Sequence, residues 1–229
     1  MNGNHKKCTA VVVAAGNSSR MRGIDKVLAP LNGVPLLLRT VRALAASSRI
    51  ECIVIVTRAE LTEQVRALCG GEVKVCAVVA GGATRAESVL CGLRHVATPF
   101  SAIHDGARPL VTAEIIDAAI AAAEEIGAAA PAVAVHDTVK IAENGLVRAT
   151  PDRTTLFAVQ TPQVFDTERI RAALTDGLAQ GLALTDDCSA AEAAGMTVAL
   201  TAGSEENIKI TTPLDLTVAE EILKRRTTA

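Results

Sequence analysis

The 229-residue chain is long enough to build a stable core without disulfides or metal ions, since a chain of this size buries roughly 70–75% of its extended surface. Its formal net charge of −2 excludes the broad basic face that neutralises many DNA phosphates. With no Trp, no Tyr and three Phe, the chain also lacks aromatic platforms for single-stranded nucleic acid. We therefore expect no nucleic-acid partner, and any anion site must come from a few converging cations.

The sequence has no signal for a membrane or for export. It contains no apolar run of about 20 residues, and its first residues, MNGNHKK, lack the apolar stretch of a signal peptide. The six cysteines form no CxxC or Cys/His zinc spacing, and several lie in apolar runs, which suits reduced, buried thiols. We expect no membrane contact and a cytoplasmic location.

Strand and helix patterns alternate through the first 135 residues. Apolar runs predict strands at residues 11–14, 53–56, 73–79, 102–104 and 132–135. Apolar residues at helical spacing predict helices at residues 35–46, 61–68, 88–95 and 112–126, the last of them ended by Gly127. Strands that alternate with helices imply right-handed crossovers and a mostly parallel sheet covered on both faces. The predicted fold class is therefore α/β and Rossmann-like.

The alternation breaks between residues 136 and 160. The sequence HDTVKIAENGLVRATPDRTTLFAVQ alternates polar and apolar residues around Asn144-Gly145, which is the strongest short signal for a β-hairpin. An isolated two-stranded ribbon is only marginally stable in water, so this inserted arm must pack on the body or on a second copy of the chain. We expect a homodimer formed through the β-arm.

Helices and one strand complete the chain. Helices are predicted at residues 167–178 and 186–194, a strand at 197–200, and the segment NIKIT at 207–211 alternates as a strand does. The sequence TPLD at 212–215 supplies an N-cap, a first-position proline and a capping-box acid for a closing helix. We expect its apolar face to consist of Leu214, Val218 and Ile222.

The first predicted strand is followed by three cations, in AAGNSSRMRGIDK at residues 14–26. This segment lacks the ending of a Walker A motif and the glycine spacing of a dinucleotide fingerprint. It does leave the carboxyl end of a strand, where open α/β sheets bind ligands. Gly16 would let the backbone wrap an anion, and Arg20 and Lys26 would add charged donors to a polyphosphate. A surface loop with solvated cations is an equally good interpretation of this segment alone.

A second glycine-bearing loop, GGATRAESV at residues 81–89, also follows a predicted strand. Gly82 permits close approach of a ligand to the backbone, and Ser88 stands where it would reach a base or a ribose. An ordinary turn followed by a helix explains the same residues. The segment is weak evidence by itself.

The segment HDGARP at residues 104–109 closes the fourth strand. Asp105, at the carboxyl end of that strand, is well placed to hold Mg²⁺ against phosphate oxygens. A helix cap or a salt bridge with Arg108 would ordinarily be favoured instead. We expect His104 to pack inside the strand rather than to act as a catalyst.

Further candidates lie in the second half of the chain. Arg153, Thr161 and Thr185 are candidates for binding a substrate phosphate, although Thr185 could equally cap a helix N-terminus. Lys140 in DTVK and Lys209 in NIKIT would, on their spacing alone, usually face solvent.

The joint order of these segments decides what none of them decides alone. The set AAG…R-M…K, GG…R…S, HDGARP, DTVK, TPQ, LTDD and NIKIT closely resembles the 2-C-methyl-D-erythritol 4-phosphate cytidylyltransferase family, from about residue 9 to about residue 220. The resemblance implies one nucleotidyltransferase domain over residues 1–229. It implies transfer of CMP from CTP to methylerythritol 4-phosphate, with release of pyrophosphate, in non-mevalonate isoprenoid synthesis. It also implies Mg²⁺ as cofactor.

The resemblance also assigns roles to individual residues of this sequence. The implied catalytic cations are Arg20, Lys26 and Lys209, and the implied metal-associated residue is Asp105. The residues implied at the CTP pocket are Ala14, Ala15, Gly16, Gly82 and Ser88. The residues implied around methylerythritol phosphate are Arg153, Thr161 and Thr185, with Arg108 and Thr138 expected to reach the substrate of the neighbouring subunit.

The chain departs from the family pattern at three positions. Ser18 stands where the loop usually has a second glycine, Asp25 where a proline often precedes the lysine, and Ala83 where some relatives have an acid. Asp25 places a negative charge beside Lys26, which would weaken CTP affinity or shift the lysine. Any contact from Ala83 to the base would have to come from its backbone.

Three other functions compete with this interpretation. A ribitol 5-phosphate cytidylyltransferase shares the fold and much of the CTP loop, but Lys140 after DTV and the LTDD segment resemble the methylerythritol enzyme more. A non-catalytic nucleotide-binding protein would not need a set of four residues, namely Arg20, Lys26, Asp105 and Lys209. A nicotinamide-dependent oxidoreductase would need the missing glycine fingerprint, and fold alone would not choose among these functions.

Overall fold

The first strand, β1 (Cys8–Ala14), lies inside the central sheet, and nearly all of its residues are buried. It pairs in parallel with β4 (Ile50–Thr57) on one side and with β6 (Phe100–Asp105) on the other. β5 (Val75–Ala80) extends the sheet beyond β4, again in parallel. The carboxyl ends of these four strands therefore lie along one edge.

The second part of the sheet is mixed. β7 (Ala128–Ala134) pairs in antiparallel fashion with β10 (Phe157–Val159) and β11 (Gln163–Asp166), and in parallel with β12 (Ala199–Ala202). β11 also pairs with β6 in antiparallel fashion, which joins the two parts. The mostly parallel sheet predicted from the sequence is confirmed, with β10 and β11 as the antiparallel members.

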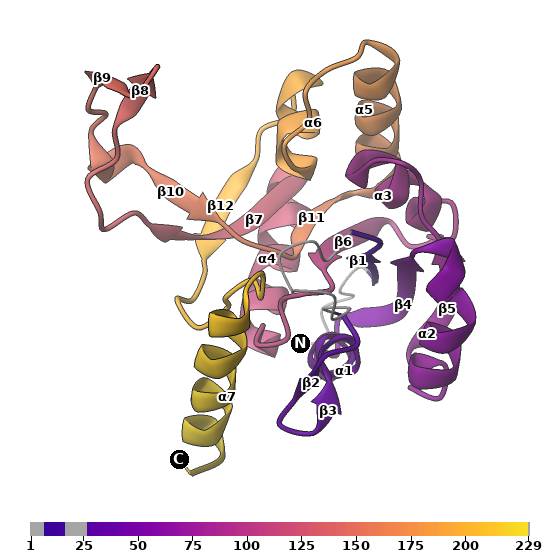
Figure 1. Ribbon diagram of the computed structural model, residues 1–229. Helices are drawn as coiled ribbons and strands as arrows, with labels where there is room; N and C mark the ends of the chain where they lie inside the picture. The colour runs from indigo at the N-terminus through magenta and orange to yellow at the C-terminus, as the bar shows by residue number, and fades with distance from the viewer. Residues whose placement is uncertain (1–6, 17–26, 229) are drawn as a thin grey trace, which may run out of the picture.

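This computed structural model describes residues 7–16 and 27–228, and these residues form one eight-stranded sheet covered by helices on both faces (Figure 1). The side chains of successive residues in β1 point to opposite faces of the sheet, as strand geometry requires. Ala10 and Val12 lie in the core cluster covered by α1 (Leu36–Ala46), α2 (Thr62–Cys69) and α4 (Ala113–Ile126). Val11 lies in the opposite cluster, covered by α3 (Arg85–Leu93), α5 (Thr167–Ala179) and α6 (Asp187–Ala193).

The helix α3 begins three residues before the start that apolar spacing predicts. Thr84 caps it, because its side chain accepts the backbone N–H of Glu87 while the Glu87 carboxylate accepts that of Thr84. This capping box corresponds to the pattern T-x-x-E in the sequence. Gly92 lets the helix lie close to the sheet, since a Cβ there would come within 2.5 Å of Val11 Cγ1. The early start places Arg85 and Ser88 at the end of α3 that faces the strand termini.

The β-arm is present as predicted. β8 (Ile141–Glu143) and β9 (Leu146–Ala149) form a hairpin whose turn residues, Asn144 and Gly145, have the positive φ angles of 51° and 78° that a tight hairpin needs. Every residue from 136 to 150 is exposed, and the arm projects from the body (Figure 1). The end of the predicted insert joins the main sheet as β10.

The C-terminal part departs from the sequence predictions in two ways. The NIKIT segment is not a strand, and the backbone N–H of Ile210 bonds to the carbonyl of Ala107 instead of to a ladder. The closing helix, α7 (Pro213–Thr228), begins where expected, but of its predicted apolar face only Ile222 is buried. Leu214 and Val218 are 70% and 42% exposed. The helix is rotated so that Ala219 and Ile222, with Leu216 and Leu223, pack against Leu31 and Leu110.

Smaller elements complete the described chain. β2 (Pro30–Leu31) and β3 (Val34–Pro35) are strands of two residues each that pair as a hairpin. The short segments η2 (Ala59–Leu61) and η3 (Arg153–Thr155) are 3-10 helices. None of the described helices combines the length and the apolar character that crossing a membrane requires.

The cysteines follow the sequence prediction only in part. Cys8, Cys69 and Cys188 are free and buried, as expected for reduced core thiols, and Cys91 is free and partly buried. The prediction is wrong for Cys52 and Cys76, which form a disulfide. Their strands, β4 and β5, are paired neighbours, so the two side chains meet across the ladder.

Candidate functional site

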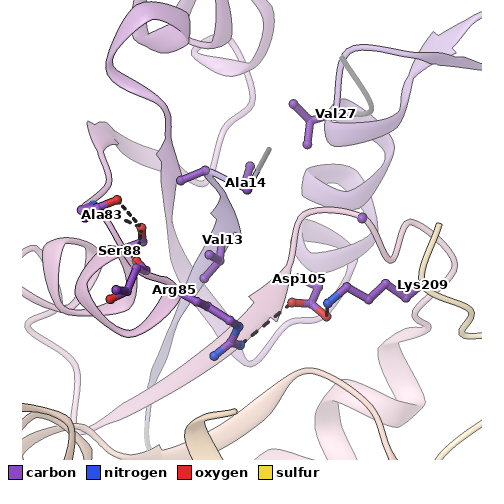
Figure 2. Close-up of a pocket in the computed structure, with 13 residues that line it drawn as sticks. Val13, Ala14, Val27, Ala83, Arg85, Ser88, Asp105 and Lys209 are labelled. Carbon is purple, nitrogen blue, oxygen red and sulfur yellow. Dashed lines mark hydrogen bonds and ion pairs between the residues drawn. The ribbon is translucent and has the colours of Figure 1, made fainter. Parts of the chain in front are cut away.

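A pocket opens where β1, β5 and β6 end. Its walls come from the end of β1, the loop and first turn of α3, the residues after β6, and the segment before α7 (Figure 2). The residues named from the sequence that line it are Ala14, Ala15, Gly16, Gly82, Ser88, Asp105 and Lys209. The fold therefore brings the implied CTP residues, the implied metal residue and one implied catalytic lysine into a single cavity.

Two of the implied catalytic cations, Arg20 and Lys26, lie outside the described residues, as do Ser18 and Asp25. Gly16 and Val27 are the described residues on either side of that segment, and both line the pocket. The catalytic roles of Arg20 and Lys26 stay predictions.

The carboxylate of Asp105 is the charge centre of the pocket. Its Oδ2 atom lies 2.9 Å from Lys209 Nζ and 3.4 Å from Arg108 Nε, and its Oδ1 atom lies 3.9 Å from Arg85 Nη2 (Figure 2 draws Lys209 and Arg85). Burial raises the pKa of Asp105, but the neighbouring cations, Lys209 first and then Arg85 and Arg108, outweigh it and lower the pKa to about 2. The carboxylate is therefore ionised at neutral pH.

Beneath Asp105, a buried chain of hydrogen bonds fixes its backbone. The carbonyl of Arg108 accepts only, so His104 Nε2 must carry a hydrogen and donate to it over 3.1 Å. His104 Nδ1 is then the acceptor for the Thr161 hydroxyl at 3.1 Å, and that hydroxyl in turn accepts the backbone N–H of Asp105. His104 has no exposed surface, which confirms that it packs inside the strand.

The segment that carries Lys209 is held by side-chain hydrogen bonds rather than by a strand ladder. Asn207 has no exposed surface, and its Nδ2 atom donates to Gln160 Oε1 and to the carbonyl of Thr161. The carbonyl of Asn207 accepts a 2.7 Å hydrogen bond from Arg108 Nη1. Sequence reasoning missed Asn207 and Gln160, because neither has a spacing signal that marks it as a buried anchor.

Ser88 and Gly82 shape the nucleotide side of the pocket. Ser88 is 2% exposed, and its Oγ atom accepts the backbone N–H of Gly82 and donates to the carbonyl of Thr84. A Cβ on Gly82 would lie 2.4 Å from Glu87 Cβ, so the turn requires glycine there. Ser88 thus holds the turn that forms one wall of the pocket.

The residues implied around the second substrate are less concentrated. Thr138, Arg153 and Thr185 are exposed and do not line the pocket. Arg153 donates to the carbonyl of His136 at the base of the arm. Asp186, rather than Thr185, caps α6, so the helix-cap alternative for Thr185 is wrong.

Two other implied substrate residues are engaged inside the described chain. Thr161 is 4% exposed, and its hydroxyl belongs to the chain of hydrogen bonds with His104 and Asp105. Arg108 is directed to Asp105 and to the carbonyl of Asn207 in its own subunit. Contacts of either residue with a substrate stay predictions.

Arg85 is a site residue to which sequence reasoning gave no role. It lines the pocket, and its Nη2 atom lies 2.7 Å from Oδ2 of Asp187, a carboxylate with no exposed surface. The signal that would have found it is the arginine within the first turn after Thr84, where a cation opposes the helix dipole and needs a partner elsewhere.

Comparison with known proteins identifies the family. Residues 8–225 match the family model described as IspD, 2-C-methyl-D-erythritol 4-phosphate cytidylyltransferase. The chain belongs to this family. It is therefore a nucleotidyltransferase of the non-mevalonate isoprenoid pathway, as the sequence predicts.

The relatives cover almost the whole chain. A 2-C-methyl-D-erythritol 4-phosphate cytidylyltransferase of Desulforamulus reducens is 46% identical over 95% of this chain and 96% of its own length. One of Synechococcus sp. is 42% identical over 95% of this chain and 99% of its own. The crystal structure of the 4-diphosphocytidyl-2C-methyl-D-erythritol synthase of Anaerococcus prevotii superposes with a TM-score of 0.86 at 28% identity, covering 96% of this chain and 97% of the other.

The buried histidine makes the stability of the fold depend on pH. Burial lowers the pKa of His104 from 6.5 to about 4, so the unfolded chain takes up this proton before the folded protein does. Stability is consequently lost as pH falls from the unfolded value towards the folded one. Between pH 7 and pH 5 we expect the free energy of unfolding to fall by about 2 kcal/mol from this residue.

Urea unfolding at pH 7, 6 and 5 measures this effect. A His104→Gln variant should have a flatter pH dependence over this range, whereas His95→Gln, which changes an exposed histidine, should follow the unmodified protein. Equal slopes for all three proteins would contradict the assignment of the buried neutral imidazole.

Proposed function

We propose that this protein transfers CMP from CTP to 2-C-methyl-D-erythritol 4-phosphate, giving 4-diphosphocytidyl-2-C-methyl-D-erythritol and pyrophosphate. The observation that carries the proposal is the convergence of Lys209, Arg85 and Arg108 on Asp105 where the parallel strands end. In the proposed reaction, Asp105 would offer its carboxylate to a metal ion, and the exposed Lys209 would offer a cation to the phosphates.

The reaction demands positioning rather than a protein nucleophile. An oxygen of the methylerythritol phosphate attacks the α-phosphorus of CTP, a new P–O bond forms, and the bond to the β-phosphate breaks to release pyrophosphate. A phosphate monoester is largely ionised near neutral pH, so no general base has to remove a proton. Alignment of two anions and stabilisation of the charge that builds up at the α-phosphorus are what the protein supplies.

Lys209 is proposed as a cation for the reacting phosphates. Its side chain is 42% exposed and lines the pocket beside Asp105, so it is accessible to a ligand. Arg20 and Lys26 are proposed to hold the triphosphate with it, on the strength of their positions after β1 and the family pattern. The hydrogen bonds of Asn207 support the proposal for Lys209, because they fix the irregular segment that carries it.

The CTP base and ribose are proposed to bind between Ala14, Ala15 and Gly16 on one side and Gly82 and Ser88 on the other. Small side chains at these positions leave backbone groups accessible at the pocket wall. Ala83 also lines the pocket and offers only its backbone for polar contacts.

Magnesium fits the donor set around Asp105. The described residues contain no cluster of three or more His, Cys, Asp or Glu side chains that would make a complete protein cage. Mg²⁺ does not require one, since it is usually held by one or two carboxylates together with substrate phosphates and water. Asp105 is the carboxylate that faces the pocket, and the bound ion would neutralise charge on the triphosphate.

The β-arm is proposed to form a homodimer and to complete the site for the second substrate. Ile141, Leu146 and Val147 are 56–64% exposed on a ribbon that lacks a packing partner among the described residues. Covering them with a second copy would remove apolar surface from water. Thr138 and Arg153 lie on or beside the arm, and with Arg108, Thr161 and Thr185 they are proposed to surround methylerythritol phosphate.

Pyrophosphate release tests the reaction and the substrate together. With CTP and Mg²⁺, we expect release on addition of methylerythritol 4-phosphate and none with ribitol 5-phosphate. Lys209→Ala should lower kcat by about 10²–10³-fold, as removal of one preorganised donor does. Lys7→Ala changes an exposed lysine outside the pocket and should leave kcat unaltered.

Two results would overturn parts of the proposal. Release with ribitol 5-phosphate alone would keep the chemistry and replace the substrate. Full activity of Lys209→Ala would remove that lysine from the reaction.

Sedimentation velocity tests the role of the arm. Charges at Leu146 and Val147, introduced as Leu146→Asp and Val147→Asp, should convert a dimer to monomers, because burying these carboxylates in an apolar interface is unfavourable. Leu214→Asp changes an apolar residue that is 70% exposed on α7 and serves as the matched control. A dimer that persists in the arm variants would refute association through this arm.

A further inference from the structure

Arg85 joins two carboxylates that belong to different parts of the site. Its Nη2 atom lies 2.7 Å from Asp187 Oδ2 and 3.9 Å from Asp105 Oδ1, and its side chain is 32% exposed at the pocket. Figure 2 shows the guanidinium reaching from the first turn of α3 towards Asp105. Asp105 ends β6, whereas Asp187 begins α6.

Burial of the Asp187 carboxylate beside Arg85 costs solvation free energy, and Arg85 does not stabilise α3 in return. Asp187 has no exposed surface, and no described donor reaches its Oδ1 atom. A carboxylate in this position needs a cation to remain charged, and Arg85 is the cation within reach. An arginine at the start of α3 also faces the positive end of the helix dipole. The position therefore serves the contacts across the pocket rather than the helix.

Asp187 connects Arg85 to the segment that begins α6. Gln163 Oε1 accepts the backbone N–H groups of Asp187 and Cys188, at 3.0 and 3.1 Å, and Gln163 Nε2 donates to Asp186 Oδ2. The start of α6 is thus fixed to β11 by Gln163 and to α3 by Arg85. Thr185 immediately precedes this fixed start.

We propose that Arg85 and Asp187 form a positioning pair that sets the Thr185 segment relative to Asp105 and the nucleotide pocket. This inference rests on the proposed function, in which Asp105 lies at the metal and triphosphate and Thr185 lies at the phosphate of the second substrate. Through this pair, the attacking phosphate is held in line with the α-phosphorus. Arg85 acts through the two carboxylates, and neither it nor Asp187 takes part in bond formation.

The proposal predicts that the loss falls mainly on the use of the second substrate. In Arg85→Met, kcat should fall by about 10²-fold and KM for methylerythritol 4-phosphate should rise, because misplacement by about 1 Å has such an effect on aligned reactants. The dissociation constant of CTP, measured by calorimetry, should rise much less than this KM, because the guanidinium is already paired with Asp187 at 2.7 Å. Arg85→Lys should recover part of the rate, since it keeps the charge without the planar fork.

A double variant separates positioning from simple stabilisation. Arg85→Met with Asp187→Leu removes both charges of the pair, and an apolar pair of similar size is commonly as stable as a buried ion pair. We expect urea unfolding of this variant to match the unmodified protein while kcat and the KM for the second substrate stay impaired. Arg171→Met is the matched control, because Arg171 also ties two elements of this layer, donating to the carbonyls of Leu93 and Val96 outside the pocket.

The outcomes are distinct. Arg171→Met should lower stability without raising the KM for methylerythritol 4-phosphate. Recovery of the full rate in the stable double variant, or a loss that lies wholly in CTP affinity, would overturn the positioning role. Absence of pyrophosphate release by the unmodified protein would overturn the proposed function, and this inference with it.

Discussion

The carboxylate of Asp105 is the constraint on which the site depends. It lies at the end of a buried strand with a side chain that is 11% exposed, and a charge so poorly hydrated must be compensated by neighbouring cations. Lys209, Arg85 and Arg108 supply that compensation from separate segments of the chain. The same attraction that makes the buried charge tolerable therefore assembles a cluster of cations at the mouth of the pocket.

In the proposed reaction, Lys209 of this cluster exchanges Asp105 for the triphosphate as its anionic partner. Lys209 lies 2.9 Å from Asp105, and a triphosphate offers it a second anion in the same pocket. A divalent cation at Asp105 would replace the charge that Lys209 withdraws. Arg85 keeps a closer carboxylate, Asp187, at 2.7 Å and so holds its place while Asp105 exchanges its neighbours. Charges that stabilise the folded protein are in this way reused for catalysis.

Much of the fold could be predicted from local patterns, and the failures have physical causes. Alternating strands and helices predicted the mostly parallel α/β sheet, and Asn144-Gly145 predicted the arm, because both patterns depend on neighbours in sequence. The NIKIT segment alternates like a strand, but the buried amide of Asn207 bonds to Gln160 and Thr161 instead of a ladder. The site residues at the ends of strands could be predicted, because local sequence marks where a strand ends. The contact of Arg85 with Asp187 could not, because it joins α3 and α6, which are far apart in the sequence.

Calorimetric titration with CTP, with and without Mg²⁺, tests the central role of Asp105 most directly. In the unmodified protein, Mg²⁺ should strengthen CTP binding. In Asp105→Asn, Mg²⁺ should strengthen CTP binding much less, and binding without Mg²⁺ should be at least as strong as before, because a negative charge next to the triphosphate is gone. The same gain from Mg²⁺ in both proteins would contradict the account.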